Sequence, residues 1–188
     1  YEPCFGRELE WIMLSAMEKI RLRTRSTYLR LSTKRVDQSL LKLPDNPEKL
    51  ETMRRQALSG AYRLIDRRTE TGYQPGLNVV HLMASGAIVP EVIEASNDLI
   101  EEGIFANVIN ITGPGPLYRS YQDISKSSVR NTGSTDLFME DVIPAPDRKA
   151  PVVTVVDGHP HTLAWIGSAL NTSTVPLGVT EFGQSGSR

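Results

Sequence analysis

The sequence has little of what defines several common classes of protein. Its single cysteine, Cys4, can neither close an internal disulfide nor build a zinc site alone, which indicates a reducing compartment. No apolar run approaches the roughly 18 to 20 residues that a membrane-spanning helix needs. Charged residues stand at positions 7, 8 and 10, so no secretory signal opens the chain. These absences predict a cytoplasmic protein with no membrane partner.

An excess of charge of one sign is also missing. The 188 residues carry 21 Lys and Arg against 22 Asp and Glu, a formal net charge of −1. This balance excludes a polybasic nucleic-acid-binding chain, and no nucleic-acid partner is expected. The basic cluster Arg21, Arg23, Arg25 and Arg30 has no accompanying aromatic series, which favours a solvated or inter-domain face over nucleic-acid contact.

The chain lacks an initiator methionine and opens close to a helical pattern, so we expect it to be a fragment of a longer polypeptide. Its length suits one domain of about 100 to 150 residues plus a remnant. The net charge is +5 over residues 1–70 and −6 over residues 71–188, which favours two parts in different surroundings.

The first 60 residues combine a helix, a strand and a connection. Apolar residues recur at helical spacing over 7–22, and alternation over 27–32 predicts a β-strand. Residues 36–60 hold a Pro-Asp-Asn-Pro turn and a short predicted helix at 48–57, typical of an exposed connection. We therefore expect a domain boundary at residue 60, with units at 1–60 and 61–188.

After residue 60, short β-type runs alternate with helical stretches. This rhythm predicts βαβ units, a mostly parallel sheet and helices on both faces. The expected strands lie at 62–65, 77–84, 106–111, 152–156 and 175–179, and the expected helices at 89–102, at 136–142 and after Pro160. The Thr112–Pro116 segment is expected to be a turn followed by a polar stretch, and His81 to be a half-buried structural residue.

Ligands of such sheets approach the carboxyl ends of the strands. The candidate loops are therefore 85–86, 112–116, 157–161 and 182–187. Asp157, His159 and His161 form the most polar cluster among them. They can cap the helix that begins at Pro160, contact an anion or substrate at its N-terminus, or take part in a metal site, for which the ligand set is incomplete. We predict possible anion or substrate-entrance contacts at these three residues and at Ser185.

Two other motifs are weaker. The glycines at 113 and 115 lack the spacing of a phosphate-binding loop, and the neighbouring prolines remove N–H groups that such a loop would use. Ser185 does not have the flanking glycine spacing of a nucleophile elbow, so a flexible loop is favoured there. The sequence thus offers no complete catalytic motif.

Several stretches together resemble one enzyme family. Residues 1–35 look like the end of the pyrimidine-binding domain of homodimeric 2-oxoacid dehydrogenase E1 components, with pyruvate dehydrogenase E1 the nearest member. The order of segments 60–62, 83–88, 152–158 and the Glu181–Arg188 run resembles the C-terminal transketolase-like domain of that family. Residues 114–135 match poorly, and Gly186 stands where pyruvate-specific enzymes carry an acidic residue.

The resemblance implies a three-layer αβα sandwich with a mostly parallel sheet, preceded by the end of a pyrimidine-binding α/β domain. It also implies a cytoplasmic homodimer that uses thiamine diphosphate and Mg²⁺ to decarboxylate pyruvate or another short 2-oxoacid such as 2-oxobutyrate. The acyl group then passes to a lipoyl-bearing E2 acyltransferase.

The family's Gly-Asp-Gly motif, which is followed by Asn, is absent from these residues, and no residue here matches its cofactor-activating glutamate. We therefore expect no catalytic residue, metal or cofactor site in this segment, which would be inactive alone and act in dimer and domain scaffolding. Two alternatives remain: the C-terminal part of a transketolase acting on sugar phosphates, and a regulatory anion-binding domain centred on His159 and His161.

Overall fold

The core of the molecule is a five-stranded mixed sheet. The computed structural model describes residues 1–23, 26–129 and 139–181. The strands are β1 (Tyr62–Ile65), β2 (Val79–Ser85), β3 (Phe105–Asn110), β4 (Val152–Val156) and β5 (Thr174–Leu177), in the order β1-β3-β2-β4-β5. Only β1 runs antiparallel to its neighbour in this sheet, β3. All five strands expected after residue 60 are present: β1 and β4 have the expected ends, and the ends of the other three are shifted by one or two residues.

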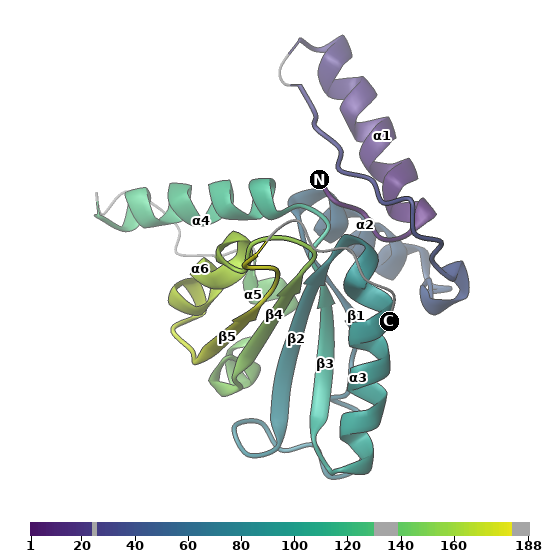
Figure 1. The fold of residues 1–188 in the computed structure, drawn as a ribbon. Coiled ribbons are helices and arrows are strands. Elements are labelled where there is room, and N and C mark those ends of the chain that lie inside the picture. Colours follow the sequence, from purple (N-terminus) through teal and green to yellow (C-terminus); the bar gives the residue numbers. More distant parts are fainter. Residues whose placement is uncertain (24–25, 130–138, 182–188) are drawn as a thin grey trace.

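Helices cover both faces of the sheet (Figure 1). The long helix α3 (Val89–Glu101) follows the short 3₁₀ turn η2 (Gly86–Ile88) and packs on β2 and β3. Helices α5 (Met139–Val142) and α6 (His161–Leu170) and the start of α4 (Pro114–Val129) cover the opposite face. Between α5 and β4 lies the 3₁₀ helix η3 (Ala145–Lys149). The predicted αβα sandwich with a mostly parallel sheet is confirmed.

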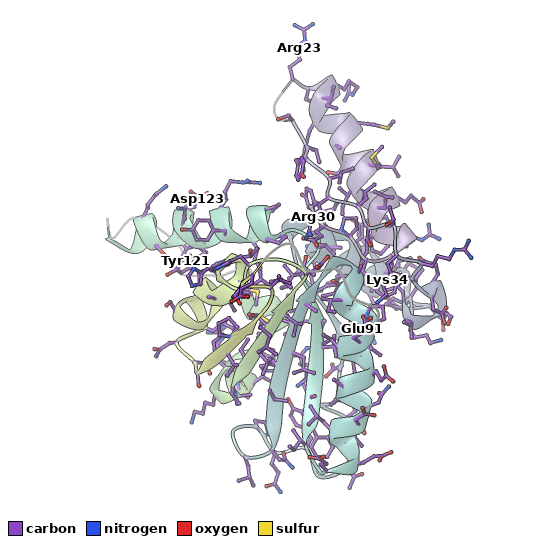
Figure 2. The ribbon with its side chains drawn as sticks, in the orientation of Figure 1. Arg23, Arg30, Lys34, Glu91, Tyr121 and Asp123 are labelled. Carbon is purple, nitrogen blue, oxygen red and sulfur yellow. The ribbon has the colours of Figure 1, made fainter. Side chains whose placement is uncertain are left out.

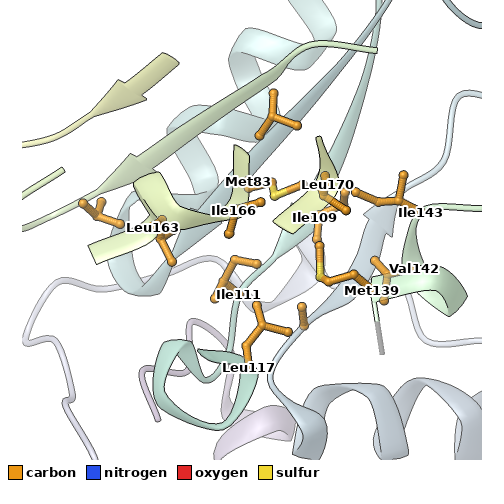
Figure 3. Close-up of a cluster of buried hydrophobic side chains, with 13 residues drawn as sticks. Met83, Ile109, Ile111, Leu117, Met139, Val142, Ile143, Leu163, Ile166 and Leu170 are labelled. Atoms are coloured by element: carbon orange, nitrogen blue, oxygen red, sulfur yellow. The ribbon is translucent and has the colours of Figure 1, made fainter. Parts of the chain in front are cut away.

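Apolar residues that alternate along β2, β3 and β4 divide the core between the two faces, because successive strand side chains point to opposite sides. Figure 3 shows the cluster beneath α6, in which Met83 and Ile109 of the sheet meet Leu163 and Ile166. On the α3 face, Leu82 and Val108 pack with Val92 and with Phe5 from the N-terminal segment. The N-terminal segment therefore shares the core of the sheet.

The N-terminal segment contains α1 (Gly6–Arg21), the 3₁₀ turn η1 (Gln38–Leu40) and α2 (Pro47–Ser59). Asn46 caps α2 by accepting a hydrogen bond from the Lys49 N–H at 2.9 Å. The expectation of an exposed connection is wrong for α2, because Met53 and Ala57 are buried against Trp11 and Tyr62. These contacts tie α1 and α2 to β1.

The predicted strand at 27–32 is wrong. Residues 26–33 run as an extended, largely exposed arm without the strand ladder that the alternation predicts. Among the described residues, the arm has two backbone–backbone hydrogen bonds, both with Tyr1: the Tyr1 nitrogen donates to Tyr28 O at 2.8 Å, and Arg30 N–H donates to Tyr1 O at 2.9 Å. Without further neighbouring strands, β-type alternation leaves both sides of the arm in solvent.

Residues 114–129 also differ from expectation, because they form a helix where a turn and a polar stretch were predicted. Pro114 suits the first position of a helix, where its missing N–H costs nothing. Leu117, Tyr121 and Ile124 recur at helical spacing within the polar stretch. Of the predicted helix at 136–142, residues 139–142 are helical and the rest lie outside the described residues.

Candidate functional site

The strands β2 and β4 are parallel neighbours in the sheet. From their carboxyl ends the chain continues toward opposite edges of the sheet. From β2 the chain passes through α3 to β3 on one side, whereas β4 pairs with the other side of β2. In open α/β sheets this crossover point forms the crevice that usually receives a ligand. Here the crevice lies between the Ser85–Gly86 turn and Asp157.

Arg30 of the arm reaches into this crevice. Its Nη2 donates to the backbone carbonyl of Asp157 at 2.8 Å, and its Nη1 bonds to Glu2 Oε1 at 2.7 Å. The Asp157 carboxylate lies further away, 3.6 Å from Nη2. Burial raises the pKa of Glu2, and the Arg30 guanidinium opposes that rise. The position of Arg30, between the arm and the upper ends of the strands, is visible in Figure 2.

Gly86 allows the Glu2 side chain to lie close to the backbone at the end of β2. Its φ of +65° is a left-handed conformation, and a Cβ there would lie 2.6 Å from Glu2 Oε1. A second contact holds the arm nearby, since Lys34 pairs with Glu91 in the first turn of α3 (Figure 2). The protein's own N-terminal segment therefore lines the crossover crevice, where a cavity of about 220 Å³ remains beside Glu2, Arg30 and Asp157.

The predicted contacts at Asp157, His159 and His161 are only partly brought together. The two imidazole rings lie edge to face with centroids 4.5 Å apart, and both side chains are exposed. His159 Nδ1 accepts a hydrogen bond from His161 N–H at 3.3 Å, which is a helix-capping contact at the start of α6. Asp157 turns instead toward Arg30. Ser185 lies outside the described residues.

Beside Arg30 a cleft of about 900 Å³ opens between α1, the arm, the end of α2 and the start of α4. Three cationic side chains, Lys19, Arg30 and Arg119, line it together with the carboxylates of Glu2 and Asp123. Neither His159 nor His161 contributes to its walls. Sequence reasoning missed this cleft because its cations are distant in sequence and only the arm's return path brings them together.

Two buried polar networks lie away from the crevice. Glu8 is fully buried and accepts hydrogen bonds from the Cys4 and Phe5 N–H groups, from Asn110 Nδ2 and from the Tyr62 hydroxyl. Burial raises the pKa of Glu8, and these hydrogen bonds oppose the rise. The network fastens the first turn of α1 to β1 and β3.

The second network is centred on Asp147 at the opposite end of the sheet. Its carboxylate accepts from Arg63 Nη2 at 3.1 Å and from the Tyr73 hydroxyl at 2.9 Å. The Asp147 carbonyl lies 3.0 Å from His81 Nε2, so Nε2 carries the proton. His81 is fully buried rather than half-buried, and burial lowers its pKa. Both features indicate a structural role for the neutral imidazole.

The described residues contain no group of three His, Cys, Asp or Glu placed to hold a metal ion. Burial, with repulsion from Glu8 and Glu91, raises the pKa of the Cys4 thiol to about 12, so it is not a reactive nucleophile at neutral pH. Among the helices of the described part, none is both long enough and apolar enough to cross a membrane.

Comparisons with known proteins identify the fold. No protein-family model matches the sequence, and no curated protein sequence matches it. Solved structures of transketolase from Pichia stipitis do match: a point mutant has a TM-score of 0.56 and 18% identity, and covers 99% of this chain and 21% of its own. A mutant in complex with fructose 6-phosphate has a TM-score of 0.57 and 18% identity, with the same coverage.

The complex with sedoheptulose 7-phosphate from the same yeast has a TM-score of 0.56 and 19% identity, again covering 99% of this chain and 21% of that chain. The chain therefore has a transketolase-like fold, that of the C-terminal domain. It spans about one fifth of the length of these transketolases.

Proposed function

We propose that this chain is the C-terminal part of a thiamine-diphosphate-dependent, E1-type 2-oxoacid dehydrogenase, and that its role is to brace domains and dimer. The observation that carries this proposal is the entry of Arg30 and Glu2 into the crossover crevice, where Arg30 bonds to Asp157. A sheet of this kind normally offers that crevice to a ligand, whereas here it receives the preceding segment of the chain. The site therefore works as a joint between structural units.

The N-terminal segment has the hydrogen-bond pattern of a βαβ unit, but its two extended stretches do not belong to the five-stranded sheet. Tyr1 donates to residue 28 and accepts from residue 30, which is the hydrogen-bond pattern of parallel strands, and α1 connects the two. The side chains of Met17 and Ile20 on α1 are 60% and 62% exposed, and Tyr28 on the arm is 78% exposed. These features support the assignment of residues 1–60 to the end of a pyrimidine-binding domain.

The described residues assemble no group of acidic side chains that would hold the Mg²⁺ that the family resemblance implies. Mg²⁺ prefers oxygen ligands in octahedral geometry, and no suitable carboxylate group is assembled in this part of the chain. The Asp157 carboxylate pairs instead with Arg30 at 3.6 Å. We propose that thiamine diphosphate and Mg²⁺ bind to domains outside this chain.

The same resemblance suggests a cytoplasmic homodimer that passes an acyl group to a lipoyl-bearing E2 protein. Pyruvate and 2-oxobutyrate are the proposed substrates. The transketolase alternative fits the fold comparisons equally well, because they match transketolase structures over nearly the whole chain. In that case the substrates would be sugar phosphates.

Assays of the complete polypeptide separate the two activities. With pyruvate or 2-oxobutyrate and an artificial electron acceptor, the E1-type enzyme should reduce the acceptor, whereas a transketolase should instead consume xylulose 5-phosphate in the presence of an aldose acceptor. Turnover of xylulose 5-phosphate alone would overturn the E1 assignment. Titration of the 188-residue chain with thiamine diphosphate and Mg²⁺ in a calorimeter should give no heat of binding, and saturable binding would contradict the scaffold role.

A further inference from the structure

We propose that Asp157 is a site of isoaspartate formation, at the place where the N-terminal arm meets the sheet. This inference goes beyond the proposed function and does not rest on it, because it concerns a single peptide bond of this chain. Asp157 and Gly158 form the only Asp-Gly pair in the 188 residues, and the sequence contains no Asn-Gly pair. The pair lies just after β4, where the chain turns toward α6.

Isoaspartate forms in two steps that need only water and a proton. The Gly158 nitrogen attacks Cγ of Asp157: the N–Cγ bond forms, a Cγ–O bond breaks, and the oxygen leaves as water with the N–H proton and a proton from solvent. Water then opens the cyclic imide at either of its carbonyls, and the new carboxyl group returns the proton to solvent. Opening at Cγ restores aspartate. Opening at the α-carbonyl leaves the main chain running through Cγ, beside a free α-carboxylate.

The structure leaves both reacting groups accessible. The Asp157 side chain is 67% exposed. The Gly158 N–H makes no hydrogen bond with any residue that the structure describes, so its nitrogen is not committed to a carbonyl. Gly158 carries no Cβ that would shield this nitrogen. A Cβ built there would meet no atom within 4 Å, which shows that the surroundings leave space for the cyclic imide.

Arg30, labelled in Figure 2, lies where the carboxylate of the product forms. Its Nη2 donates to the Asp157 carbonyl oxygen at 2.8 Å, and the Asp157 carboxylate lies 3.6 Å from the same nitrogen. Isoaspartate exchanges these two roles, because the carbonyl group becomes the charged carboxylate and Cγ enters the main chain. Arg30 then bonds to a full negative charge in place of a backbone dipole, which favours the product.

The modification should loosen one attachment of this loop and spare another. An isoaspartyl residue lengthens the main chain by one C–C bond, about 1.5 Å. Gly158 moves with it, and its carbonyl accepts a hydrogen bond from the Val179 N–H at 2.8 Å. A Cβ at Gly178 would overlap that carbonyl oxygen, so the two segments are closely packed. We therefore expect the contact with residues 178–179 to loosen while Arg30 keeps the arm in place.

Incubation of the folded 188-residue chain at neutral pH tests the proposal. The methyltransferase that transfers a methyl group from S-adenosylmethionine to isoaspartyl carboxylates counts the product, and electron-transfer fragmentation locates it. We expect methyl acceptance to grow with time and to map to Asp157. Acceptance that maps to another aspartate such as Asp98, or that grows only when the chain is unfolded in urea, would overturn the assignment.

Two variants test the chemistry. Gly158→Ala adds a methyl group that shields the nitrogen, and the open space around it accommodates the side chain, so this variant should lose the methyl acceptance. Asp157→Asn should reach the same cyclic imide faster, with release of ammonia. Equal acceptance in the wild type and in Gly158→Ala would refute the mechanism, and amide spectra report independently that the chains are folded.

The contribution of Arg30 has its own test. In Arg30→Ala the ratio of isoaspartate to aspartate after prolonged incubation should fall by about threefold, the effect of a partly exposed ion pair. Arg55→Ala removes the same charge from an exposed position on α2 and should leave the ratio unchanged. In the modified wild type, amide exchange should accelerate at Val179 and not at Arg30. Equal ratios in the two variants, or faster exchange at Arg30 alone, would contradict the stabilisation of the product by Arg30.

Discussion

Arg30 donates a hydrogen bond to the backbone carbonyl of Asp157, a residue 127 positions further along the chain, at 2.8 Å. This single contact joins the N-terminal arm to the end of β4. It also brings a positive charge to the crossover crevice of the sheet, where Glu2 balances it. The crevice is consequently a place where the N-terminal arm is attached to the sheet.

Replacing Arg30 with Ala should loosen the arm. Because the Arg30 side chain is 47% exposed, we expect a loss of only about 1 kcal/mol in the free energy of unfolding. Amide exchange at residue 30, whose N–H bonds to Tyr1, should accelerate markedly. Arg35→Ala, a change of equal charge at an exposed position just beyond the arm, is the control. Equal exchange rates in the two variants would argue against the anchoring role.

Glu8 should make the stability of the chain depend on pH. Burial raises its pKa above the usual 4.5, so the folded state binds a proton more tightly than the unfolded state. The associated stability is complete below pH 4.5 and is lost as the pH rises through the folded-state pKa. Each unit of elevation corresponds to about 1.4 kcal/mol.

The variant Glu8→Gln does not titrate at this position and should lose this part of the pH dependence. Urea unfolding at a series of pH values measures the slope directly. Glu10→Gln, on the exposed side of α1, should keep the wild-type slope. A slope in Glu8→Gln that matches the wild type would show that Glu8 is not the responsible group.

Gly60 should not tolerate a side chain. Its φ is +122°, and a Cβ would lie 2.6 Å from the backbone oxygen of Gly113. We expect Gly60→Ala to lower the free energy of unfolding by about 2 kcal/mol or more. At Gly158 a Cβ would meet no atom within 4 Å, so Gly158→Ala should be nearly neutral. Thermal unfolding of both variants compares these positions, and similar melting temperatures would contradict the steric explanation.

The Asp147 ion pair should be among the more costly polar contacts to break. Asp147→Asn keeps the shape of the side chain but leaves the Arg63 guanidinium, whose side chain is only 9% exposed, without its closest charge partner. The expected loss is about 3 kcal/mol, as for other broken buried pairs. Asp98→Asn, exposed on α3, should change stability by less than about 0.5 kcal/mol. Chemical denaturation measures the free energy of unfolding of both variants, and equal losses would contradict the importance of the ion pair.

The exposed face of α1 tests the scaffold role. Met17→Asp should leave the stability of the 188-residue chain within about 0.5 kcal/mol, because the side chain is 60% exposed. In the complete polypeptide the same change should reduce stability and activity, since it would place a charge where α1 meets the proposed pyrimidine-binding domain. Equal tolerance in both contexts would count against that packing.

The sequence by itself determined the five strands after residue 60 and the helices α3 and α6. Alternation in β4 and helical spacing in α3 are local patterns, and each element buries the face that its own pattern defines. The same reasoning failed for the arm at 27–32, because a strand also needs neighbours that local alternation cannot supply. It failed for α4 because serines concealed a helical stripe that includes Leu117 and Tyr121.

Only the tertiary structure decided what occupies the carboxyl ends of the strands. The local sequence predicted contacts at Asp157, His159 and His161, because these polar residues lie close together after a predicted strand. The arrangement instead depends on Arg30 and Glu2, which reach that edge because the arm returns along Tyr1. Contacts between residues more than a hundred positions apart depend on the path of the whole chain, and no local pattern of residues encodes that path.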